Sequence, residues 1–319
     1  MMEKGEFELI DWIKGQFPVP DGILGIGDDC AVLPQREGVE TLVSTDMLVE
    51  GVHFLLEDID PYSLGWKSAA VNLSDIAGMG GKPVGTFLCC ALPKGLDESF
   101  LEGFFNGYKA ISDRFDCPLL GGDTTSSKDR LCINVTALGE CPAGHSHKRS
   151  QAMPGDLVCV TGPLGDSGAG LKIILEGSAA EGMESTLRER HYRPVPRVEE
   201  GIRLASTPGV NAMMDISDGI GSDLRHILKA SGAAARVDVR SLPLSAEMQD
   251  VCQKRGWDPV ELATGGGEDY ELLFTCRPGT SIPVAHTVIG EILATGSGHD
   301  AGTVEWIGGD RDYKGFRHF

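Results

Sequence analysis

Six short segments, each rich in glycine, aspartate, serine or threonine, carry the side chains that could do chemistry. They are GIGDD (25–29), STD (44–46), NLSDIAGMGG (72–81), GGDTTSS (121–127), DISDGIGSD (215–223) and GGGED (265–269). Each places a carboxylate at the edge of an apolar run, and glycine lets the backbone approach a ligand closely. One such segment alone is usually a turn. Six of them together favour a shared binding site.

Carboxylates stand close together in three of these segments, as Asp28 with Asp29, Asp215 with Asp218, and Glu268 with Asp269. Neighbouring carboxylates repel each other unless a cation or a shared proton lies between them. Oxygen ligands without supporting His/Cys pairs favour Mg²⁺ or Ca²⁺ over zinc, and no EF-hand spacing is present. Because Mg²⁺ takes few protein carboxylates and completes its shell with water and phosphates, the pattern predicts several Mg²⁺ ions around a polyphosphate.

Other classes of protein are disfavoured by motif and by composition. GMGGKP (78–83) has proline where a Walker A loop needs Ser or Thr, and GIGDDC lacks the third glycine of a dinucleotide fingerprint. The 319 residues include 47 acidic and 28 basic ones, a net charge of −19, so neither nucleic acid nor an anionic membrane is expected as partner. The charged first residues and the lack of a long apolar run predict a cytoplasmic protein. Nine cysteines without a CxxC pair favour buried thiols.

Strand-like runs and amphipathic helices alternate along the chain. The expected strands are 41–44, 85–92, 131–138, 157–161, 211–216, 270–276 and 287–292, and the expected helices are 61–78, 97–115, 167–176, 198–205, 218–231 and 245–255. A polar, proline-containing segment at 141–156 separates two such groups, which predicts domains at 1–142 and 150–319. The charged stretch 182–197 is expected to be a surface connection within the second domain.

The expected helix 61–78 positions one carboxylate on a rigid element. Ser68, Asn72 and Asp75 share one face, opposite the apolar residues. A carboxylate at the C-terminal end of a helix opposes the helix dipole. A solvated polar face is the plain alternative, but a cation beside Asp75 would explain its unfavourable place.

Taken together and in this order, the motifs GIGDDCAVL, STDMLVEGVHF, KSAAVNLSDIAGMGG, GGDTT, DISDG and GGEDYELLF resemble the thiamine-monophosphate kinase family. Its superfamily also contains aminoimidazole ribonucleotide synthetase, selenophosphate synthetase and a hydrogenase maturation protein. The resemblance runs from GEFELI (5–10) to the C-terminal KGFRHF. It implies an α+β fold of two domains: an N-terminal domain whose sheet pairs across a homodimer into a β-barrel, and a C-terminal α/β domain. ATP would lie in a cleft shared with the partner subunit.

The resemblance also implies roles for individual residues. The Mg²⁺ ligands would be Asp29, Ser44, Thr45, Asp46, Asp75, Asp123, Asp215 and Asp218, with Asp28 beside them. The ATP contacts would be Gly122, Asp123, Arg149 and Ser217. The contacts with the thiamine substrate would be His53, Glu268 and Tyr313. Tyr313 stands in DYKGFRHF where the family has a tryptophan, and tyrosine also stacks on a flat cationic ring.

The implied reaction is ATP plus thiamine monophosphate giving ADP plus thiamine diphosphate. The acceptor is a phosphate monoester with a second pKa of about 6, so it is already an anion and needs no general base. Direct in-line transfer assisted by Mg²⁺ follows from this chemistry. Two alternatives stay open: a synthetase like aminoimidazole ribonucleotide synthetase, and a non-catalytic acidic protein that binds divalent metal ions. A selenophosphate synthetase is disfavoured, since Cys30 follows two carboxylates that would raise its pKa.

Overall fold

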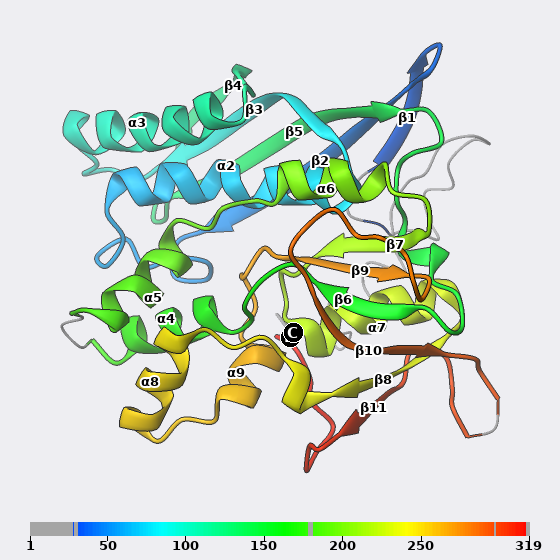
Figure 1. Ribbon diagram of the computed structural model, residues 1–319. Helices are drawn as coiled ribbons and strands as arrows, with labels where there is room; N and C mark the ends of the chain where they lie inside the picture. The colour runs from blue at the N-terminus through cyan, green and yellow to red at the C-terminus, as the bar shows by residue number, and fades with distance from the viewer. Residues whose placement is uncertain (1–27, 29–30, 178–180, 297, 317–319) are drawn as a thin grey trace.

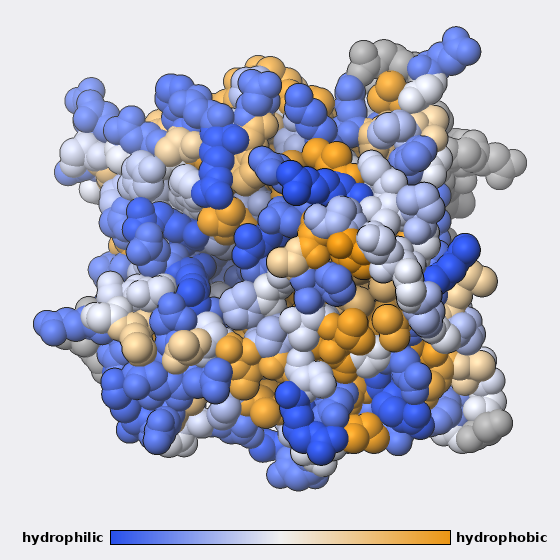
Figure 2. All heavy atoms as spheres, in the orientation of Figure 1, coloured by the Kyte–Doolittle hydropathy of each residue, from blue (hydrophilic) through white to orange (hydrophobic). Residues whose placement is uncertain are grey.

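The computed structural model describes residues 28, 31–177, 181–296 and 298–316, which form two sheets with helices between and around them (Figure 1). All the strands and helices expected from the sequence are present in this part of the chain, with some ends shifted by a few residues. No described helix combines the length and hydrophobicity needed to cross a bilayer. On the face shown in Figure 2, hydrophilic residues predominate and hydrophobic residues form separate small groups.

The first sheet has the strand order β1-β2-β5-β3-β4 and is antiparallel except between β3 and β4. Its strands are β1 (Ala31–Arg36), β2 (Val39–Val49), β3 (Lys82–Leu92), β4 (Leu119–Ser126) and β5 (Cys132–Pro142). Helices α2 (Pro61–Gly78) and α3 (Glu98–Arg114) cover one face. Leu88 and Cys90 of β3 are buried beneath these helices, whereas Phe87 and Cys89 are exposed on the other face. The sheet is therefore covered on one side and open on the other.

The second sheet has the strand order β11-β8-β10-β6-β9-β7. Its strands are β6 (Leu157–Val160), β7 (Val210–Asp215), β8 (Ala234–Asp238), β9 (Leu272–Cys276), β10 (Thr287–Leu293) and β11 (Val304–Ile307). Only the β11–β8 pair is parallel, so the expectation of an α/β C-terminal domain is wrong. Strands β6 and β7 do run parallel, as helical connections require, but the antiparallel strand β9 lies between them. The whole chain is accordingly α+β.

Helices cover both faces of the second sheet. Helix α7 (Ile220–Ser231) packs on one face, against Val158 and Met214, while α6 (Val198–Ala205) packs on the other, against Cys159 and Met213. The remaining helices are α4 (Asp166–Leu175), α5 (Met183–Tyr192), α8 (Ala246–Arg255), α9 (Pro259–Gly265) and the 3₁₀ turns Arg149–Gln151 and Val239–Ser241. Period-two burial along β6 and β7 thus directs neighbouring side chains into separate cores.

Segment 182–197 is not the surface connection that its charge suggested. It contains α5, which buries Leu187 and His191 against the rest of the domain. The other side chains of α5 are mostly polar, so its narrow buried stripe left little hydrophobic signal in the sequence.

Helix α2 lies between the two sheets and contacts the first sheet, α3, α6 and β7 (Figure 1). Asp60 caps its N-terminus by accepting a hydrogen bond from the Ser63 N–H at 2.9 Å, and Pro61 begins the first turn. Glycine permits its close contact with α3, because a Cβ at Gly65 would lie 1.9 Å from the Phe104 carbonyl oxygen. Almost every side of α2 is therefore buried.

Candidate active site

Four carboxylates from separate segments of the sequence act electrostatically on the buried side chain of Tyr270. Burial, followed by the charges of Glu268, Asp46, Asp215 and Asp75, raises the pKa of Tyr270 well above its usual value. These carboxylates come from β2, from α2, from the end of β7 and from the turn before β9. The structure therefore brings together residues from four of the six segments that the sequence singled out.

Hydrogen bonds tie the STD segment of β2 to α2. The Ser44 hydroxyl donates to the Asp75 carboxylate, and the Asp46 N–H donates to the Asn72 side-chain oxygen at 3.1 Å. Asn72 in turn donates to the Ser68 carbonyl at 3.2 Å. Since Ser68 and Asn72 are fully buried, this polar face of α2 is not a solvated surface. It holds the backbone of β2 against the helix that carries Asp75.

The neighbouring residue on α2 reaches the other half of the molecule. The Ser74 hydroxyl donates a 2.6 Å hydrogen bond to Oδ2 of Asp215, and both side chains are buried. Asp215 is the last residue of β7, where the second sheet meets the helix. One turn of α2 thus fixes carboxylates that belong to both domains.

The acidic loop, which runs from the end of β7 into the first turn of α7, adds a residue that the sequence analysis did not single out. Asp223 is 1% exposed and accepts a 3.1 Å hydrogen bond from the Asp218 N–H. Burial, and then the charges of Asp218 and Asp215, raises its pKa well above the usual value. One ligand atom each from Asp218, Asp223 and His226 lie within 4.8 Å of one another, close enough to hold a metal ion. The sequence could have identified Asp223, because it is the last residue of the DISDGIGSD segment.

Arg149 lies beside this loop. Its N–H donates to the Asp28 carboxylate at 3.2 Å, and its carbonyl accepts from the Ser231 hydroxyl at 2.7 Å. Burial, and then the charge of Arg149, lowers the pKa of His226 to about 4. The predicted nucleotide contact is therefore near the acidic loop. Asp29, the predicted ligand next to Asp28, lies outside the described residues.

The GGGED turn is clamped onto the same loop. The Glu268 N–H donates to the Ser217 carbonyl at 2.7 Å, and the Tyr270 N–H donates to the Ile216 carbonyl at 2.9 Å. Both Glu268 and Tyr270 have positive φ, at 55° and 51°, which side-chain-bearing residues adopt only where the surroundings enforce it. The clamp places Glu268 next to Ser217, the second predicted ATP contact.

Asp269 does not pair with Glu268 around a cation, as the adjacent charges suggested. Its carboxylate accepts the N–H groups of Gly165 at 2.6 Å and Ser167 at 3.1 Å, at the start of α4. Burial raises its pKa to about 8 even though these hydrogen bonds oppose the change. Because adjacent side chains leave the turn in different directions, Asp269 serves the N-terminus of a helix while Glu268 is directed to Lys67 of α2.

His53 lies on the Glu268 side of the site. Its Nδ1 accepts the Val49 N–H at 3.0 Å, which places the proton of the neutral imidazole on Nε2. It lies within electrostatic range of Glu268. Two of the three residues predicted to contact thiamine are therefore near one another.

Three predicted site residues lie apart from this group within the chain. Thr45 points to the open face of the first sheet and donates to the Val135 carbonyl at 3.1 Å, whereas Ser44 faces α2. Gly122 and Asp123 lie on the exposed edge strand β4. Asp46 and Gly122 are separated by three strand spacings across the β2-β5-β3-β4 register, or about 14 Å.

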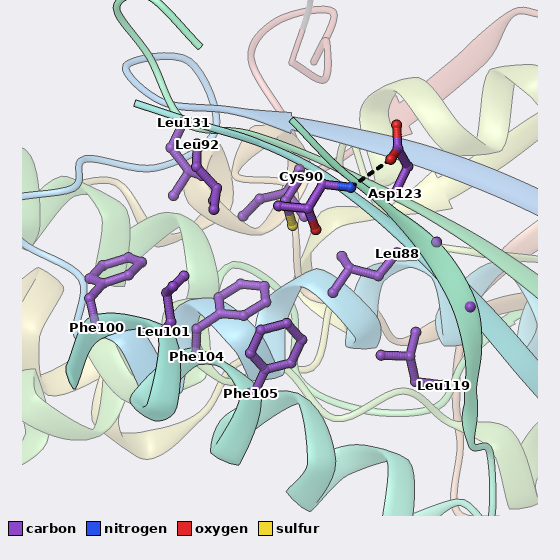
Figure 3. A pocket seen from close by; sticks show the side chains of 14 residues that line it. Leu88, Cys90, Leu92, Phe100, Leu101, Phe104, Phe105, Leu119, Asp123 and Leu131 are labelled. Carbon is purple, nitrogen blue, oxygen red and sulfur yellow. Dashed lines mark hydrogen bonds between the residues drawn. The ribbon is translucent and has the colours of Figure 1, made fainter. Parts of the chain in front are cut away.

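Gly122 is required by the sheet itself, because a Cβ there would lie 1.7 Å from the Leu88 carbonyl oxygen. Next to it, Asp123 extends away from the phenylalanines of α3 (Figure 3). Its carboxylate accepts the Thr124 N–H at 2.9 Å. Asp123 therefore lies away from the α2 carboxylates of its own chain.

Tyr313 is 6% exposed and packed in the core of the C-terminal domain. Its ring meets Trp306 edge to face, with centroids 5.3 Å apart. Phe316, three residues later, is 50% exposed, and its N–H donates to the Asp218 carbonyl at 2.8 Å. Phe316 is thus the aromatic residue that the C-terminal segment places beside the acidic loop.

Two family models match the chain: "AIR synthase related protein, N-terminal domain" over residues 27–141, and "AIR synthase related protein, C-terminal domain" over residues 153–281. A curated thiamine-monophosphate kinase from Salmonella typhimurium is 42% identical, over 100% of this chain and 99% of its own. The thiamine-monophosphate kinase of Escherichia coli K12 is 39% identical over the same shares.

Solved structures agree with these matches. A structure described as AaThiL complexed with AMPPCP and TMP superposes with a TM-score of 0.91 at 36% identity, over 100% of this chain and 98% of that one. The thiamine-monophosphate kinase of Stenotrophomonas maltophilia gives a TM-score of 0.77 at 36% identity, over 94% and 96%. The chain therefore belongs to the AIR synthase related family and, within it, to the thiamine-monophosphate kinases.

Proposed function

We propose that this chain phosphorylates thiamine monophosphate with ATP by direct in-line transfer, assisted by several Mg²⁺ ions, in a homodimer. The observation that carries the proposal is the set of hydrogen bonds by which α2 brings Asp46, Asp75 and Asp215 together. The relative described as AaThiL binds an ATP analogue and TMP, which supports the two substrates.

The donor set fits Mg²⁺. The carboxylates that raise the pKa of Tyr270 and of Asp223 repel one another, and divalent cations relieve such repulsion. Carboxylate and hydroxyl oxygens are the ligands that Mg²⁺ prefers. The proposed ligands are Asp29, Ser44, Thr45, Asp46, Asp75, Asp123, Asp215 and Asp218. Bound Mg²⁺ would supply neutralising charge and a template for the phosphate oxygens of both substrates.

The side chains of the protein then bind and align the two substrates. Arg149, held by Asp28, offers its guanidinium to the phosphates of ATP, together with Ser217 on the loop after β7. Glu268 and His53 hold the thiamine part of the acceptor, and the exposed Phe316 is the proposed aromatic contact in place of the buried Tyr313. Since the acceptor phosphate is already an anion, none of these residues has to remove a proton.

A second copy of the chain would complete the site. The open face of the first sheet exposes Met47 and Phe87, and the edge strand β4 exposes Leu119. An exposed apolar sheet face with an unpaired edge tends to be covered by a partner. Asp123 and Gly122 lie on this edge, so β4 of a partner subunit could bring them to the α2 carboxylates. Phe87→Glu is expected to lower the sedimentation coefficient to that of a monomer and to reduce activity.

One assay tests the reaction. The protein is incubated with ATP, Mg²⁺ and either thiamine or thiamine monophosphate, and thiamine diphosphate is measured. We expect product from the monophosphate alone, because no positioned base is proposed for a hydroxyl acceptor. Product from thiamine alone would refute the substrate assignment. Turnover of an aminoimidazole ribonucleotide precursor would support a synthetase instead, and Mg²⁺ binding without any ADP release would support a non-catalytic protein.

A further inference from the structure

Helix α2 buries a lysine at the edge of the substrate side of the site. The side chain of Lys67 is 1% exposed, although lysines are almost never fully buried unless they are paired. Its Nζ lies 3.1 Å from both Oε1 and Oε2 of Glu268 and 3.3 Å from Nε2 of His191. Lys67 therefore engages both oxygens of one carboxylate.

His191 of α5 completes the surroundings of this ammonium group. Burial, and then the charge of Lys67, lowers the pKa of His191 to about 3, so its imidazole is neutral. Lys67 donates to Nε2, which leaves the imidazole proton on Nδ1, 3.0 Å from the Ser167 hydroxyl. The imidazole thus orients Lys67 without sharing its positive charge.

The backbone of Glu268 is fixed by a hydrogen bond, whereas its side chain is partly exposed. Its backbone is clamped to Ser217 in a left-handed turn, while its side chain is 26% exposed. Burial acts to raise the pKa of Glu268, but the charge of Lys67 and its hydrogen bond to the carboxylate outweigh burial and hold the pKa below its usual value. The carboxylate is therefore ionised and fixed, and it remains partly exposed.

We propose that Lys67 is a positioning residue for substrate recognition: it holds Glu268 charged and oriented toward the permanently cationic ring of the substrate, which Lys67 itself does not touch. This rests on the proposed function, in which Glu268 contacts thiamine monophosphate. A carboxylate meets a cationic heterocycle most strongly when it is ionised and its orientation is fixed beforehand. Buried ion pairs are weak stabilisers compared with apolar residues, which agrees with a role in recognition.

The test is a double-mutant cycle with Lys67→Met, Glu268→Gln and the combined variant, with Lys109→Met as the matched control. Lys109 lies on the surface of α3, where it pairs with Asp113. Steady-state kinetics give kcat and separate KM values for thiamine monophosphate and ATP. Each site variant should raise KM for thiamine monophosphate about 10–100-fold, the range for loss of a charge-assisted hydrogen bond, with KM for ATP within about threefold of wild type.

The combined variant should match Glu268→Gln within about threefold, because Lys67 has nothing left to position once the carboxylate is gone. Lys67→Arg, which keeps the charge, should recover most of the affinity lost in Lys67→Met. If Lys67→Met alone does not fold, the comparison of Glu268→Gln with the combined variant still tests the proposal.

Effects that multiply in the combined variant, or a parallel rise in KM for ATP, would overturn the proposal and leave Lys67 a structural residue. Wild-type protein that makes no thiamine diphosphate would instead contradict the proposed function. The two failures are therefore distinct.

Discussion

Replacing Ser74 by alanine should weaken Mg²⁺ binding without removing any proposed ligand. The Ser74 hydroxyl is 2.6 Å from Oδ2 of Asp215, and both side chains are buried, so Ser74→Ala leaves a buried carboxylate one donor short. Hydrogen bonds to charged groups contribute about 1.5–3 kcal/mol. In a chain of this size that corresponds to a fall of roughly 2–5 °C in the midpoint of thermal unfolding.

The same change should alter catalysis through Asp215. Loss of a partner that orients a metal ligand usually costs about 10–100-fold in metal affinity, so the Mg²⁺ concentration for half-maximal activity should rise by that factor. Saturating Mg²⁺ should restore most of the rate.

Ser68 offers a matched control on the same helix. It is also fully buried, but its hydroxyl bonds only to the Leu64 carbonyl one turn earlier, at 2.7 Å. Such bonds within a helix add little stability, so Ser68→Ala should change neither readout. Activity is measured against Mg²⁺ concentration for the wild type, Ser74→Ala and Ser68→Ala, and the midpoint of thermal unfolding is measured for the same three proteins. A wild-type Mg²⁺ dependence in Ser74→Ala would refute the role given to Asp215.

Asp75→Asn should lower kcat/KM by about 100-fold or more, a loss of roughly 3 kcal/mol in transition-state stabilisation, measured at saturating Mg²⁺; unchanged kinetics would argue against a metal ligand there. Arg197→Met removes the partner of the buried Glu271 carboxylate, to which the partly exposed Arg197 donates hydrogen bonds of 2.8 and 2.5 Å, so it should lower stability by about 1.5–3 kcal/mol in thermal or urea unfolding. Adding Glu271→Gln to that variant should recover part of the loss, and a neutral single variant would show that the pair contributes nothing. The pKa of Asp269, about 8 in the fold, lies above its unfolded value, so the native state binds the extra proton and this residue lowers stability as pH rises from about 4 to 8. Asp269→Asn should flatten that part of the pH–stability profile, and an unaltered slope would count against the raised pKa.

The sequence predicted the elements well wherever periodicity was strong. Helices α2 and α6 begin and end at the residues expected. A proline marks the start of α2, and a clear apolar stripe marks α6. Strand β4 was not predicted, because all of its residues are exposed and it therefore lacks the alternation of buried and exposed residues that indicates a strand. Helix α5 was missed for a related reason, since only a narrow stripe of it is buried.

The site was predictable as a set of residues but less so as an arrangement. Asp46, Asp75 and Asp215 were named from motifs, and they do lie together. The opposite directions of Ser44 and Thr45 follow from strand alternation once β2 is known. Lys67 could not be identified, because a lysine in an amphipathic helix usually faces water. Its burial depends on partners 124 and 201 residues away in the chain. The burial of Tyr313 likewise depends on tertiary packing against Trp306.

The burial of α2 on nearly all sides restricts how this protein can change. A one-residue insertion early in the helix would rotate everything after it by about 100°. This single insertion would break both the hydrogen bond from Ser74 to Asp215 and the hydrogen bond from Ser44 to Asp75. The length of this segment therefore cannot change one residue at a time. Diversification of the enzyme should therefore be concentrated in its loops, and alignments of distant relatives should show no gaps across these eighteen residues.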